Sequence, residues 1–174
     1  KEGDFIRRTN EVLLSMADEL RRGMLVLFTS RGHLYRSYHD LRDQFAQRGI
    51  TLLAQGLDGS RNLLLRRFRE DVSSVLFGMD SFWEGVDVPG KALELVVIVR
   101  LPFAVPTDPI VQAQMEELER AGKNPFTCLS VPEAAIKLRQ GAGRLIRHRN
   151  DRGAVVILDK RVNTTWYGKL FRRS

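Results

Sequence analysis

Apolar residues recur along the chain in two alternating patterns, which predict alternating strands and helices. Short runs such as "MLVLF" from residue 24 and "LELVVIV" from residue 93 are typical of strands buried on both faces. Longer segments carry apolar residues at three- and four-residue spacing, as amphipathic helices do. The pattern predicts strands over 24–30, 50–54, 73–79, 93–100 and 153–159, and helices over 5–22, 33–49, 61–71, 109–121, after 130 and over 164–171.

Polar residues, glycines and prolines predict several of the boundaries. Asp4 and Ser60 are residue types that cap helix N-termini, and Ser130 with Glu133 has the S-x-x-E spacing of a capping box. Gly49 is a typical C-terminal stop. The three prolines of "LPFAVPTDP" interrupt both helix and strand, so this segment is expected to be irregular.

Together these elements predict an α/β fold with three layers, a mostly parallel sheet flanked by helices. Continuously apolar strands that alternate with helices are typical of this class. The length of 174 residues fits a single domain over 1–174. In such sheets ligands bind beyond the carboxyl ends of the strands, here at "TSRGH" (29–33) and "GMDSFWEGVD" (78–87).

Charge points to a polyanionic partner. The net charge is +7 and the isoelectric point is near 10.1, which favours nucleic acid or nucleotide, although basic proteins of this size also occur without such partners. The one cysteine, Cys128, excludes an internal disulfide and a cysteine metal cluster, and the histidines are expected at the surface without metal-ligand spacing. No apolar run is long enough to span a membrane, so we expect a cytoplasmic protein without membrane partners. The chain begins at Lys1, and we expect it to be part of a longer protein.

The segment "GVDVPGKA" (85–92) has the spacing of a phosphate loop but lacks its chemistry. Ala92 replaces the hydroxyl that would bind Mg²⁺, and Pro89 removes a backbone N–H that would bind phosphate. An apolar strand follows, whereas a phosphate loop opens a helix. The sequence therefore predicts no triphosphate site held by this chain alone.

The segment "QGAGRLIR" (140–147) carries Arg144 and Arg147 three residues apart, a spacing that places side chains on one face of a helix. Two guanidinium groups side by side suit a phosphate. The alternative is a solvated basic helix face. With no phosphate loop in the chain, the arginines are expected to reach a phosphate held by another domain, as arginine fingers do.

Several segments taken together resemble the XPD/DinG group of superfamily 2 DNA helicases, and within it the bacterial DinG type. They cover most of residues 24–171 and include "VLFTSRGHL", which matches the motif IV region. "SFWEGVDVPG" resembles motif V and "QGAGRLIR" motif VI, with "LPF…DP" and "ILDKR…YGK" beside them.

The resemblance implies a second, RecA-like motor domain, the C-terminal helicase domain of a longer chain. Two such domains clamp ATP and move along single-stranded DNA with 5′ to 3′ polarity. The first domain would hold ATP and Mg²⁺ and, in some members, an iron–sulfur cluster. The expected partners are single-stranded DNA and that first domain, in a bacterial, nucleoid-associated DNA-repair setting. The isolated chain is expected to be inactive.

The resemblance also implies roles for individual residues. Catalytic contacts to the ATP phosphates fall to Arg147, Arg144 and Gln140, with Arg147 as the finger. Gly143, Glu84, Gly85 and Asp87 are expected at the nucleotide, with Glu84, Gly85 and Asp87 coupling its state to the grip on DNA. The expected DNA contacts are Thr29, Ser30, His33, Ser81, Phe82 and Trp83.

Competing interpretations stay open for some of these residues and for the function. Trp83 suits packing as well as base stacking, and Asp87 suits a turn. Asp159, Lys160 and Arg161 follow the last strand and point to a site or to solvent. A nucleotide-sensing or nucleic-acid-binding α/β module, or a translocase without unwinding activity, would share these features. A phosphate loop and a DEAH-like box in preceding sequence would identify a motor.

Overall fold

The computed structural model describes residues 2–79, 82, 92–105, 107–143 and 152–172. Five parallel strands form one sheet in the order β2-β3-β1-β4-β5. The predicted α/β class with a parallel sheet flanked by helices is confirmed. The strands are β1 (Met24–Leu27), β2 (Leu52–Ala54), β3 (Val75–Gly78), β4 (Leu95–Ile98) and β5 (Ala154–Ile157).

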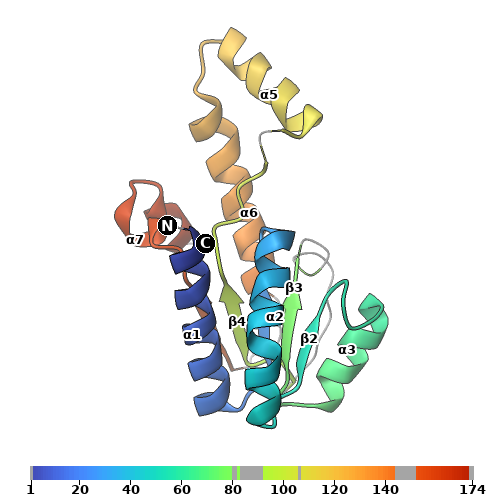
Figure 1. Ribbon diagram of the computed structural model, residues 1–174. Coiled ribbons are helices and arrows are strands. Elements are labelled where there is room, and N and C mark those ends of the chain that lie inside the picture. Colours follow the sequence, from blue (N-terminus) through green and yellow to red (C-terminus); the bar gives the residue numbers. More distant parts are fainter. Residues whose placement is uncertain (1, 80–81, 83–91, 106, 144–151, 173–174) are drawn as a thin grey trace.

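Helices cover both faces of this sheet, as Figure 1 shows. Alternate residues of each strand point to opposite faces. Accordingly Met24 and Val26 belong to the hydrophobic cluster between the sheet and two helices, whereas Leu25 and Leu27 belong to a second hydrophobic cluster on the opposite face. The first pair of helices is α1 (Glu2–Leu20) and α2 (Arg31–Gln47), and the other face carries α3 (Arg61–Glu70), α6 (Val131–Ala142), α7 (Arg161–Thr164) and α8 (Gly168–Arg172).

Helix α5 (Pro109–Arg120) differs from the others because none of its residues is buried. It lies beyond the carboxyl ends of the strands and away from the sheet (Figure 1). Its bounds confirm the predicted helix over 109–121, and Asp108 caps its N-terminus by accepting from the N–H groups of Ile110 and Val111. None of the helices in the described ranges is long and apolar enough to cross a membrane.

The predicted caps had mixed outcomes. Ser60 caps α3 as expected, and its side chain accepts from the N–H of Leu63. The Asp4 cap is wrong, because α1 already runs from Glu2 and places Asp4 within its first turn.

The capping box at Ser130 is also wrong. Ser130 has helical backbone angles and makes no side-chain cap bond. It ends a π-helical turn, η2 (Phe126–Ser130), that runs directly into α6. The side chain of Asn124 caps this earlier start instead, accepting from the N–H groups of Phe126 and Thr127.

Candidate functional site

The carboxyl ends of the parallel strands bring several polar segments to one edge of the sheet. Thr29 and Ser30 follow β1, Arg100 follows β4, and Asp159 follows β5. Strands β1 and β4 are direct neighbours, as are β4 and β5, so these segments lie in the order of the strands along the edge. This is the edge at which open α/β sheets bind their ligands.

Ser30 begins α2 at the end of β1. Its Oγ accepts from the backbone N–H of His33 at 3.3 Å, and its own side chain is exposed. Thr29 beside it is half-buried. The start of a 17-residue helix presents unpaired N–H groups and a partial positive charge, both of which favour an anion.

His33 is buried, which differs from the expectation that it reaches a DNA phosphate and that all the histidines are at the surface. Its side chain is 6% exposed and lies edge-on to Phe28 at 5.2 Å and to Phe5 at 5.6 Å between ring centroids. Burial, with the nearby positive charge of Arg100, lowers the pKa of His33 to about 4. The imidazole is therefore neutral at pH 7 and, in the first turn of α2, packs against the rings of Phe28 and Phe5.

Phe82 is also buried, contrary to the expectation of a direct DNA contact. Its side chain is fully buried and its ring packs against the backbone of Gly78, where an added Cβ would lie 2.8 Å from the ring. The Phe82 N–H donates to the carbonyl of Met79 at 2.8 Å. The other expected residues of this segment, Ser81, Trp83, Glu84, Gly85 and Asp87, lie outside the described residues.

The segment "QGAGRLIR" begins in the last turn of α6. Gln140 is exposed, and Gly143 forms the C-cap, where its N–H donates to the carbonyl of Arg139 at 2.8 Å. Arg144 and Arg147 lie outside the described residues. The amide of Gln140 is a donor and an acceptor on an exposed side chain at the end of α6.

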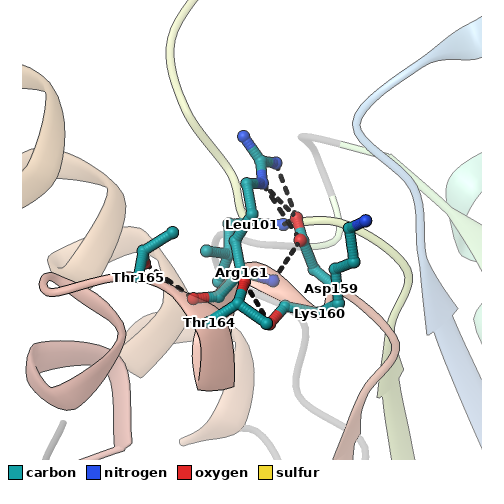
Figure 2. Close-up of polar contacts among 6 residues, drawn as sticks. All are labelled: Leu101, Asp159, Lys160, Arg161, Thr164 and Thr165. Carbon is teal, nitrogen blue, oxygen red and sulfur yellow. Dashed lines mark hydrogen bonds and ion pairs between the residues drawn. The ribbon is translucent and has the colours of Figure 1, made fainter.

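Asp159 lies at the centre of a hydrogen-bonded clamp after β5 (Figure 2). Its carboxylate accepts from the N–H of Leu101 after β4 at 3.0 Å, and from the N–H and the guanidinium of Arg161, the shortest at 2.6 Å. Burial alone would raise the pKa of Asp159, but these hydrogen bonds hold it below its ordinary value. Asp159 therefore ties the exits of β4 and β5 together as a carboxylate.

Arg100 and Phe5 form a contact that the sequence pattern did not indicate. The guanidinium carbon of Arg100 lies 4.0 Å from the centroid of the Phe5 ring, a cation–π contact. The available signal for Arg100 was its position as the first charged residue after an apolar strand. The signal for Phe5 was absent, because an aromatic residue in an amphipathic helix is usually explained by the core.

The described residues contain no cluster of three potential metal ligands, and Cys128 is exposed and free. Strand β4 begins at Leu95, soon after the phosphate-loop-like segment, which confirms that a strand follows it. Residues 85–91 of that segment lie outside the described part of the chain.

Comparison with known proteins places the chain in a family. The helicase C-terminal domain family matches residues 13–174. The chain is 44% identical over 169 residues to "3'-5' exonuclease DinG" of Bacillus subtilis, covering 97% of this chain and 18% of that protein. It is 41% identical over 165 residues to "ATP-dependent DNA helicase YoaA" of Haemophilus influenzae, covering 94% of this chain and 25% of that protein.

A solved structure titled "XPD_Helicase" shares the fold, with a TM-score of 0.71 at 22% identity over 96% of this chain and 30% of that one. The chain thus spans about a fifth to a quarter of the two curated relatives' length. The matches in sequence and fold agree with the resemblance to the XPD/DinG group. The chain belongs to the helicase C-terminal domain family, in its XPD/DinG branch.

Proposed function

We propose that residues 1–174 form the second motor domain of an ATP-dependent DNA helicase. The observation that carries the proposal is the "QGAGRLIR" segment, which starts from the exposed end of α6 in a chain of this family. The names of relatives such as the Haemophilus influenzae helicase support the reaction. The first motor domain, on the same longer protein, would complete the ATP site.

The nucleotide side of the domain comprises Gln140, Gly143, Arg144 and Arg147. Arg147 acts as the arginine finger, and its planar fork stabilises charge that develops on the transferred phosphoryl group. Arg144 contacts the phosphates beside it, and Gln140 hydrogen-bonds the nucleotide or its attacking water. ATP supplies the free energy, and Mg²⁺ is held mainly by the preceding domain.

The DNA side lies at the strand ends. Ser30 and Thr29 at the start of α2 offer hydroxyl and backbone N–H donors to a DNA phosphate. His33 and Phe82, which the structure buries, support these segments rather than touch the strand. The loop residues Ser81 and Trp83 complete the contact, and Glu84, Gly85 and Asp87 link it to the nucleotide.

ATP turnover measured with and without the preceding motor domain tests this division of labour. The 174-residue chain alone should show no DNA-stimulated ATP hydrolysis above buffer, whereas the longer protein should hydrolyse ATP and unwind DNA. Turnover by the isolated chain that persists through repurification and disappears in Lys91→Ala would contradict the proposal. It would assign a working phosphate loop to residues 85–92.

A further inference from the structure

A pocket of about 450 Å³ opens beside the carboxyl ends of β4 and β5, on the side covered by α1. This volume lies within the range of pockets that bind small organic ligands, and it exceeds what a bare anion needs. Its walls come from α1, from Arg100 shortly after β4 and from the segment after β5. They comprise Phe5, Arg8, Thr9, Val12, Arg100, Leu158, Asp159, Lys160 and Arg161.

The pocket carries more positive charge than its own residues neutralise. Arg161 is paired with Asp159, the pocket's only carboxylate. Within the described part of the chain, Arg8, Arg100 and Lys160 form no ion pair. Cations gathered in one hollow repel each other, and this cost falls when an anion enters.

Contacts within the protein hold two of these cations, or the segment that carries them, in place. The guanidinium of Arg100 rests on the face of Phe5. Lys160 lies between Asp159 and Arg161. The carboxylate of Asp159 accepts from both the backbone N–H and the guanidinium of Arg161 (Figure 2). A ligand that binds here pays little to order these segments, because the protein has ordered them beforehand.

Apolar surface accompanies the charge. Phe5, Val12 and Leu158 line the same pocket, and Val12 is 38% exposed. A free phosphate gains nothing from contact with apolar side chains, whereas a nucleotide has a sugar and a base beside each phosphate that can pack against them. Cations next to apolar surface are the combination that single-stranded nucleic acid requires.

The pocket also continues the proposed DNA contact at Ser30. The Phe5 ring touches both Arg100 and the His33 ring, and the backbone N–H of His33 donates to Ser30. A DNA single strand that runs along the sheet edge from the end of β1 would next meet the ends of β4 and β5.

We propose that Arg8, Arg100 and Lys160 bind the phosphodiester backbone of single-stranded DNA in this pocket, extending the strand contact beyond Ser30. The inference rests on the proposed function and assigns it a second DNA subsite. Arg161 stays with Asp159 and positions Lys160.

The test compares two variants of equal net charge in the 174-residue chain. Arg8→Gln with Lys160→Gln removes two pocket cations, and Arg66→Gln with Arg67→Gln removes two exposed cations of α3, at the β2 and β3 side of the sheet. Fluorescence anisotropy with labelled oligothymidylate of 15 nucleotides measures Kd across a salt series. Thermal melting checks that both variants are folded.

The pocket variant should bind at least about fivefold more weakly than the α3 variant, and its log–log salt slope should fall by about 1.4, the value for two lost contacts to a single strand. Equal affinities for the two variants would overturn the pocket assignment but leave the proposed function standing, since ATP turnover of the longer protein tests that separately. Absence of oligothymidylate binding by the unaltered chain at low salt would also overturn it.

Competitors identify the source of the phosphate. Thymidine monophosphate and inorganic phosphate, at the same phosphate concentration as unlabelled oligothymidylate, should compete far less well than the oligonucleotide. Equal competition would assign the pocket to free anions and contradict a strand contact.

Discussion

The carboxylate of Asp159 binds the guanidinium of Arg161 two residues later, with 2.6 Å between Oδ2 and Nη2. The same carboxylate accepts from the N–H of Leu101, which follows the neighbouring strand. The guanidinium also lies 5.2 Å from the centroid of Phe103. One buried carboxylate therefore connects the segments that follow β4 and β5, and it holds the start of the segment from Leu101 that leads to α5.

Replacing Asp159 with Asn should destabilise the domain. The amide can still accept from Leu101, but Arg161 would lose its counter-charge while partly buried, at a cost of about 1–3 kcal/mol. Thermal melting should show a lower Tm for Asp159→Asn, while Lys160→Gln, next to it and exposed, should melt close to the unaltered chain. Equal melting temperatures for the two variants would show that the clamp adds no stability.

The stability of the domain should rise with pH between about pH 4 and pH 6.5 because of His33. Its pKa is about 4 when folded and 6.5 as a model value, so in this window the unfolded chain binds the extra proton. The neutral imidazole thus contributes stability that is fully present above pH 6.5 and is lost as pH falls toward 4. Arg100 and Arg36 lower the pKa in the same direction as burial, and Glu2 opposes them.

Urea unfolding at pH 7 and at pH 4.5 measures this effect, which should be on the order of 2 kcal/mol. In His33→Phe, which keeps an aromatic ring between Phe5 and Phe28, the difference between the two pH values should shrink by that amount. A pH dependence unchanged by this substitution would assign it to other groups.

Gly78→Ala should destabilise the end of β3. The new Cβ would lie 2.8 Å from Phe82, so the ring or the strand would have to move, at a cost of about 1–3 kcal/mol. Gly32→Ala is the matched control, because its Cβ would meet only the Ser30 hydroxyl at 3.8 Å. Urea unfolding should separate the two variants, and adding Phe82→Leu to Gly78→Ala should recover part of the loss. A Gly78→Ala chain as stable as the control would mean that Phe82 is not held against Gly78.

The sequence pattern was sufficient for the sheet but not for the residues around its edge. The apolar runs predict all five strands, because a strand such as β1, β3 or β4 that is buried on both faces is apolar at every position. Strand β5 has the same apolar run although Ala154 and Val155 are exposed. The prediction that His33 lies at the surface is wrong because His33 shares a buried helix face with Ser37 and Leu41. Polar residues on that face make it look exposed in the sequence. The S-x-x-E spacing at Ser130 did not indicate that the helical segment starts earlier, where the side chain of Asn124 accepts from the N–H groups of Phe126 and Thr127.

The pocket at β4 and β5 shows a different limit. Arg8, Arg100 and Lys160 are far apart in the sequence, and their meeting depends on how α1 packs across the strand ends. No spacing rule applies to such a set. By contrast, Arg144 and Arg147 in "QGAGRLIR" are three residues apart, so their spacing in the sequence is enough to suggest a phosphate contact.

The steady-state ATPase of the longer protein carrying Arg147→Ala tests the proposed arginine finger most directly. If Arg147 is the finger, its guanidinium acts in the transition state, so kcat should fall roughly 10³-fold or more with a much smaller change in KM. Arg147→Lys should not restore turnover, because an ammonium lacks the planar fork. A kcat within about threefold of the unaltered protein, together with a sharply lower Tm of the 174-residue chain carrying the same substitution, would contradict a catalytic role and make Arg147 a structural residue.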